Sequence, residues 1–207
     1  MLPIVAILLV IGLALDLFAP IKRDFRSFDP VEVGKLDAGM WRSYYEHRPV
    51  KLFFQLSKLM RSQFHSPWFR SYMIAFYSAK AAYLFKNGHD RVDYTKVLPY
   101  LNAFYKQLES LSDRHFNFLL LAKTELEWWI IRRESDRHSP EDWKILLGNE
   151  GEIMYAVPAN RFGTYAEQRV HAMLLRDGKG QIMNEEDWAQ ISKICIAAWT
   201  SFHEVLK

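Results

Sequence analysis

Five carboxylate and imidazole side chains have a spacing that could bind a divalent metal ion. On one expected helix Glu134 precedes His138 by four residues, and on another Glu167 precedes His171 by four. Residues four apart share a helix face, so each pair could hold one ion, with Glu127 as a further ligand. Ferritin-like bundles, however, use Glu-x-x-His motifs, and this chain has none. Helix capping and surface pairing are therefore the favoured interpretation, and we expect no metal or other cofactor.

Two acids and two arginines fall on apolar helix faces, where a buried charge needs a partner of opposite sign. They are Asp37, Arg133, Arg169 and Asp177. Each lies among apolar residues at three- and four-residue spacing. We expect buried salt bridges that fix how the helices pack, Asp37 with Arg133 and Arg169 with Asp177. The alternative interpretation of the same residues is a polar pocket for an anion or a polar substrate.

No catalytic or cofactor-binding motif in the sequence is specific. Serine, histidine and aspartate residues are too scattered to argue for a triad, and Gly178-Lys179-Gly180 is typical of a turn rather than a phosphate-binding loop. Cys195 is the only cysteine, which rules out an intramolecular disulfide and a Cys-based metal cluster. The sequence therefore favours a non-catalytic protein and leaves an enzyme as the alternative.

An apolar segment, residues 2–19, precedes the basic residues Lys22, Arg23 and Arg26. Eighteen helical residues rise roughly 27 Å, which is close to the thickness of a bilayer's hydrocarbon core. We expect residues 1–20 to form a single-pass transmembrane anchor. The basic flank should face an anionic lipid surface and place the body on the cytoplasmic side. A signal-type segment, and a helix buried in the body's own core or against a partner, are the alternatives.

Residues 30–207 have the pattern of an all-α domain, joined to the anchor by a linker, residues 21–29. Turn and cap signals divide this domain into about eight helices, and strand-type alternation is scarce. The strongest helix-start signals are Asp29-Pro30, Ser139-Pro140 and Asn184. Short connections favour a bundle of antiparallel helices, with a helical-repeat array as the alternative.

Composition and charge limit the class of protein. Half of the 207 residues are apolar and 15% are aromatic, so the chain can form a sizeable core and is not disordered. The formal net charge is +3, basic and acidic residues are expected to interleave along the chain, and no Lys/Arg run reaches five. Nucleic acid is therefore not expected as a partner.

Together these features predict a membrane-anchored, non-catalytic helical module. Its expected role is that of an accessory, scaffold or assembly subunit of a membrane-associated complex. Its expected partners are the lipid bilayer and other subunits of such a complex. The alternative is a helical-bundle enzyme or ligand-binding protein with a buried polar site, whose ligands could include carboxylate and histidine side chains on a metal.

Overall fold

The computed structural model describes residues 2–180 and 182–207, and every regular element in these ranges is helical. Met1 of the expected anchor and Gln181 of the expected helical domain lie outside the described residues. The all-α prediction is confirmed. In chain order the elements are α1 (Leu2–Phe18), α2 (Pro30–Tyr45), α3 (Pro49–Ser62), α4 (Trp68–Asn87), α5 (Arg91–Thr95), α6 (Leu98–Leu111), α7 (Phe118–Arg133), α8 (Pro140–Tyr155), the 3-10 helix η1 (Ala159–Phe162), α9 (Gly163–Lys179) and α10 (Glu185–Leu206).

Side-chain caps begin several helices where the sequence indicates. Asp29 accepts hydrogen bonds from the backbone N–H groups two and three residues further on, and Pro30 occupies the first position of α2. Ser139 and Asn184 each form a capping box with the aspartate three residues later, at the starts of α8 and α10. These start signals are confirmed because each cap satisfies N–H groups that have no partner within the helix.

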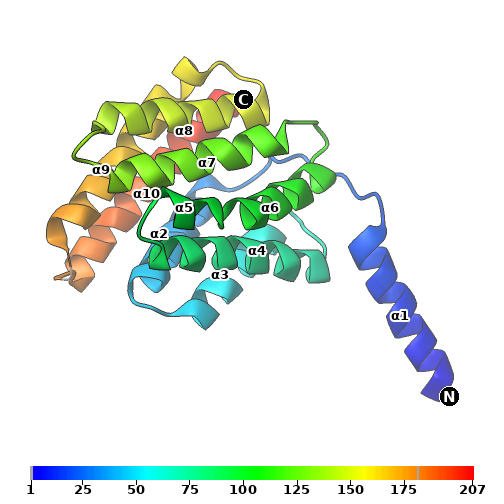
Figure 1. Ribbon diagram of the computed structural model, residues 1–207. Helices are drawn as coiled ribbons and strands as arrows, with labels where there is room; N and C mark the ends of the chain where they lie inside the picture. Colours follow the sequence, from blue (N-terminus) through cyan, green and yellow to red (C-terminus); the bar gives the residue numbers. More distant parts are fainter. Residues whose placement is uncertain (1, 181) are drawn as a thin grey trace.

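The helices of the body pack in a closed circuit (Figure 1). From α2 to α4 and from α6 to α10 each helix contacts the next, α4 contacts α6, and α10 returns to pack against α2. At this return, a Cβ atom on Gly34 of α2 would lie 2.5 Å from the Cα of Ile196 in α10, so a larger residue would collide with the backbone. An open repeat array lacks a contact between its first and last helices. The structure is therefore a bundle.

The segment between α1 and α2 packs as part of the body. Phe25 and Phe28 are buried in the main core cluster, inside the circuit of helices. The backbone of Arg23 exchanges hydrogen bonds with the end of α6 and the segment after it, donating to Leu111 (2.7 Å) and accepting from Asp113 (3.0 Å). Residues 21–29, expected as a linker, are thus held against the bundle by both core packing and backbone hydrogen bonds.

α1 leaves the body at one end and points away from it (Figure 1), and its helix contact is with α4. Asp16 accepts hydrogen bonds from the backbone N–H groups of Phe69 (3.0 Å) and Arg70 (3.1 Å), so it caps the first turn of α4. The Arg70 guanidinium donates in return to the carbonyl oxygens of Leu17 (2.9 Å) and Ala19. This reciprocal contact fixes the direction of α1, because it satisfies end groups of both helices.

The apolar segment was expected to span a bilayer. Among residues 2–180 and 182–207, no helix is both long enough and apolar enough to cross a membrane. The expected transmembrane helix is therefore not supported by the structure.

Candidate functional site

The basic residues after α1 differ in their surroundings. Arg23 and Arg26 turn their guanidinium groups toward the body, where they donate to the carbonyl oxygens of His65 (2.9 Å) and Tyr155 (2.8 Å). Lys22 is exposed. Of the three residues expected to face lipid, Lys22 is thus the one whose charge points to solvent, because the two arginines bond to backbone of the bundle.

A buried ion pair joins α2 to α9 near the centre of the circuit. Asp37 and Arg169 are each 7% exposed, and the guanidinium donates to the carboxylate. Trp199 of α10 donates from Nε1 to the same carboxylate at 2.8 Å, and the Arg169 guanidinium lies 4.6 Å from the ring centroid of Trp41. Asp37 and Arg169 both point inward, and the partner of each is the other.

Cys195 lies close to this ion pair and is fully buried. Burial raises the pKa of its thiol to about 12, so the sulfur stays protonated at neutral pH. A protonated, buried thiol is a packing group rather than a nucleophile.

The expected pairing of Arg133 with Asp37 is wrong. Arg133 is exposed at the last position of α7 and donates to the carbonyl oxygens of Gly88 (2.9 Å) and Lys86 (3.3 Å) at the end of α4. Its guanidinium also lies over the ring of Phe85, 4.1 Å from the centroid. A helix C-terminus carries unpaired carbonyl groups and partial negative charge, which explains why this arginine caps α4 instead of entering the core.

The expected pairing of Asp177 with Arg169 is also wrong. Asp177 is exposed near the end of α9 and accepts two hydrogen bonds from Arg132, at 3.0 and 2.8 Å. Arg132 donates as well to the hydroxyl of Tyr45 on α2, at 3.0 Å. Arg132, which lies next to Arg133 on α7, therefore ties α7, α9 and α2 together. Helix periodicity placed these residues near an interface but could not assign the partner, because partners come from other helices.

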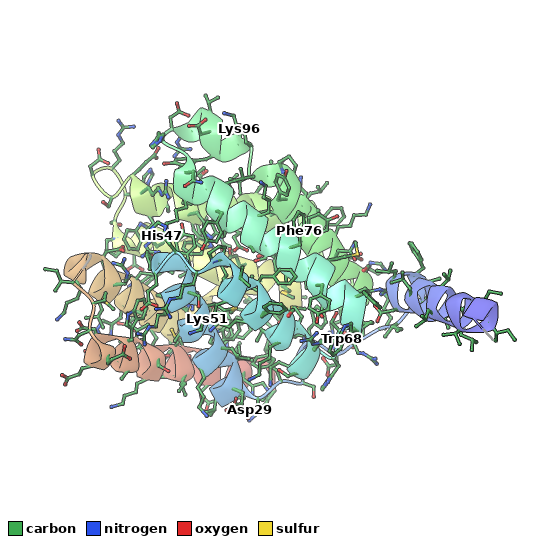
Figure 2. The ribbon with its side chains drawn as sticks, turned by 90° about the horizontal axis from the view of Figure 1, so that it is seen from below. Asp29, His47, Lys51, Trp68, Phe76 and Lys96 are labelled. Carbon is green, nitrogen blue, oxygen red and sulfur yellow. The ribbon has the colours of Figure 1, made fainter. Side chains whose placement is uncertain are left out.

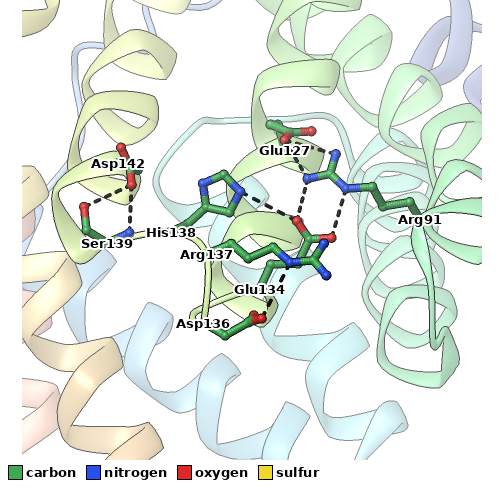
Figure 3. Close-up of polar contacts among 8 residues, drawn as sticks. All are labelled: Arg91, Glu127, Glu134, Asp136, Arg137, His138, Ser139 and Asp142. Carbon is green, nitrogen blue, oxygen red and sulfur yellow. Dashed lines mark hydrogen bonds and ion pairs between the residues drawn. The ribbon is translucent and has the colours of Figure 1, made fainter.

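Three of the expected metal candidates lie around an arginine (Figure 3): Glu127 on α7, and Glu134 and His138 just after its end. Arg91 donates to Glu134 at 2.6 Å and to Glu127 at 3.3 Å, while Nε2 of His138 lies 3.7 Å from Glu134. Hydrogen bonding from Arg91 lowers the pKa of Glu134. The guanidinium carries a fixed positive charge, so it takes the position between these carboxylates that a cation would need.

The other metal candidates, Glu167 and His171, lie on the exposed face of α9. Within the described part of the chain, no three His, Cys, Asp or Glu side chains form a group that could hold a metal ion. The five candidates thus divide into an ion-pair cluster around Arg91 and a surface pair.

A partly open cavity of about 180 Å³ lies among the helices of the body. Its lining is almost entirely apolar and comes from the segment before α2 and from α3 and α6–α10. Glu150 of α8 is the one acid among the described lining residues, and its buried Oε1 has no hydrogen-bond partner among them. An apolar cavity of roughly 150 Å³ is large enough to hold a benzene molecule. This cavity could therefore take the apolar part of a small ligand.

Glu150 is close to a second carboxyl group, Glu125 of α7. Desolvation by burial, together with the charge of Glu125, raises the pKa of Glu150 well above its usual value. Desolvation also raises the pKa of Glu125 to about 7, while the positive charge of Arg169 opposes the shift. Both shifts favour the protonated form, and a protonated carboxyl group is a hydrogen-bond donor.

The Glu125–Glu150 pair was not among the expected site residues. A sequence signal for Glu150 exists, since it lies three residues after buried Leu147 and four before Met154, on the inward face of α8. The second carboxylate comes from another helix, so the sequence alone does not bring the two together.

No family model, no curated protein and no solved structure matches this chain. What its residues can do therefore follows from their own geometry and chemistry.

Proposed function

We propose that this protein is a membrane-anchored, non-catalytic helical module. α1 inserts into a lipid bilayer as a single-pass anchor and holds the bundle at the cytoplasmic surface. There the bundle serves as an accessory, scaffold or assembly subunit of a membrane-associated complex.

The observation that carries this proposal is the surface of α1. Ten of its large apolar side chains are between 37% and 79% exposed. Soluble monomers rarely expose an apolar patch of more than a few hundred Å². A helix that is apolar on all sides is found buried in a protein core or in a membrane. The body contacts α1 at its end near Asp16.

The length and the flank of α1 suit a lipid environment. Its 17 residues rise roughly 26 Å, at the short end of the range for helices in bilayers, and bilayers thin locally around a short apolar helix. Lys22 follows on the side of the body, and basic flanks favour the cytoplasmic side.

Charges introduced at the middle of α1 should release the protein from membranes. Each arginine at the centre of an inserted helix costs about 3 kcal/mol, so Leu9→Arg with Val10→Arg should shift the insertion equilibrium by about 6 kcal/mol. We expect the unchanged chain to float with lipid vesicles and to resist a carbonate wash, and the double variant to remain in the soluble fraction. The measurement is the distribution between the two fractions.

A matched control changes two adjacent exposed leucines of α7, Leu119→Arg with Leu120→Arg. That variant should float like the unchanged chain, because these positions belong to the body. Recovery of the unchanged chain in the soluble fraction after the wash would overturn the anchoring proposal.

A second candidate function, small-ligand binding, is favoured by the cavity at Glu150. A neutral carboxyl group in an apolar cavity can donate one hydrogen bond to an oxygen atom of an otherwise apolar molecule. The chemistry that fits is thus a small aromatic or aliphatic compound with a single hydroxyl or carbonyl group.

Binding of benzene tests whether the cavity accepts an apolar molecule, and binding of phenol tests whether Glu150 adds a hydrogen bond. We expect both to raise the melting temperature of the protein in a saturable way, and phenol to bind about fivefold more tightly, since one net hydrogen bond contributes about 1 kcal/mol. Glu150→Leu should remove the preference for phenol. Melting temperatures that respond to neither compound would exclude this candidate.

A further inference from the structure

α4, which contacts α1, and its neighbour α3 carry a one-sided charge. Residues 47–89, which contain α3 and α4, include seven Lys and Arg residues and neither Asp nor Glu, although the chain has 27 basic and 24 acidic residues. The rest of the chain is therefore net acidic. This corrects the expectation that the two charge types interleave along the whole chain.

Aromatic and basic side chains of these two helices share one outward surface. On α3 and on α4 the exposed residues recur at spacings of three, four and seven, which places them along one side of each helix. We call this surface the α3–α4 face, and Figure 2 looks onto it with Lys51 and Phe76 labelled. It consists of Lys51, Phe54, Lys58, Phe69, Phe76 and Lys80.

A further exposed aromatic side chain, Trp68, adjoins Phe69 at the end of this face nearest α1. Trp68 begins α4 and is exposed, and the Arg61 guanidinium of α3 lies 4.1 Å from its ring centroid. Tryptophan with neighbouring basic residues is typical of the headgroup level of a membrane, where an amphipathic ring contacts both lipid and water.

The contact between α1 and α4 sets the position of this face. Asp16 of α1 caps the turn of α4 that contains Phe69, so the apolar helix and the aromatic end of the face are joined by direct hydrogen bonds. In Figure 1, α3 and α4 form the lower side of the bundle, and α1 runs downward to the right of it. A bilayer that contains α1 therefore lies next to the α3–α4 face.

We propose that the α3–α4 face lies against the headgroups of anionic lipids. Its lysines attract the negative surface of the membrane, and its phenylalanines enter the region between headgroups and acyl chains. The occupant is lipid rather than another protein, because the face is continuous with the apolar surface of α1 and carries no acid. This inference rests on the proposed anchoring by α1, and it fixes which side of the bundle faces away from the membrane.

A fluorescent probe at the face tests this orientation in the full chain. The native Cys195 is buried with a protonated thiol, so Phe76→Cys can be labelled selectively with an environment-sensitive fluorophore. A matched probe at Ile145→Cys on α8 has nearly the same exposure, 56% against 53% for Phe76. Each labelled chain is reconstituted into vesicles of phosphatidylcholine, with or without phosphatidylserine, that also contain a headgroup-quencher lipid.

We expect several-fold stronger quenching at position 76 than at position 145, and a further increase at position 76 when phosphatidylserine is present. Each lysine near an anionic surface strengthens attraction about fivefold, so Lys51→Gln, Lys58→Gln and Lys80→Gln together should weaken contact with phosphatidylserine about 100-fold and abolish that increase. The same change at three other exposed lysines, Lys106, Lys123 and Lys193, should leave it intact.

The outcomes separate this inference from the anchoring proposal. Chains that float with the vesicles but show equal quenching at positions 76 and 145 would overturn the orientation and leave the anchor standing. Quenching at position 76 that is the same with and without phosphatidylserine would overturn the proposed attraction of the lysines to anionic lipid. Chains that float with neither kind of vesicle would overturn the anchoring and this inference together.

Discussion

Replacement of Arg169 by methionine is expected to lower the free energy of unfolding by about 3–5 kcal/mol. Asp37 would remain buried, with only Trp199 to hydrogen-bond its carboxylate, and a buried charge without a counter-charge is unstable. The measurement is denaturant unfolding of the full chain in detergent micelles.

Two further variants separate the lost ion pair from lost packing. Arg137→Met removes an arginine that is 74% exposed and whose ion-pair partner, Asp136, is also exposed, so it should change stability by less than about 0.5 kcal/mol. Asp37→Asn added to Arg169→Met should recover part of the loss, because asparagine removes the stranded charge and still accepts from Trp199. Equal effects of Arg169→Met and Arg137→Met would contradict the assignment of a buried ion pair.

Arg132→Met is expected to lower the free energy of unfolding as well. Its side chain holds Asp177 and Tyr45 at the junction of three helices.

Raising the pH from about 5 to about 8 is expected to destabilise the folded state through Glu125 and Glu150. The folded-state pKa values of both lie above the unfolded value of about 4.3. The folded state therefore holds more protons than the unfolded state in this window. The contribution of these protons to the free energy of unfolding is fully present below about pH 4.3. It is lost as the pH rises through the folded-state pKa values. The pKa of about 7 for Glu125 corresponds to a loss of about 3 kcal/mol.

Glutamine at both positions tests this pH dependence. Glu125→Gln with Glu150→Gln should flatten the stability curve across the window, since glutamine does not titrate. Glu204→Gln, at an exposed position of α10, should keep the slope of the unchanged chain, because its environment is solvent. If the double variant keeps the full slope of stability against pH, the carboxyl pair does not cause the pH dependence. In that case the proposal that Glu150 is a neutral hydrogen-bond donor for a ligand also fails.

Helix starts could be predicted from the sequence because a cap needs only neighbours along the chain. Asp29, Ser139 and Asn184 satisfy N–H groups within three residues of themselves, so no other helix is required. The same holds for the inward direction of Asp37 and Arg169, which follows from the 3.6-residue period of their own helices.

Partners across the core could not be predicted in this way. Arg133 follows the apolar face of α7, but its position in the last turn leaves it beside the end of α4, whose carbonyl groups attract it. Glu125 and Glu150 belong to different helices, so their mutual effect on pKa exists only after α7 and α8 pack.

The sequence by itself determined the helical class, the apolar α1, and the lack of acids in residues 47–89, because these are properties of composition and local order. Only the tertiary structure decided that Asp16 caps α4, that Phe25 and Phe28 enter the core, and that α4 joins α1 to the second basic helix, α3. The physical reason is that a cap, a core contact or a common face between two helices requires residues far apart in the chain to meet. Their meeting depends on how every helix in the closed circuit packs against its neighbours.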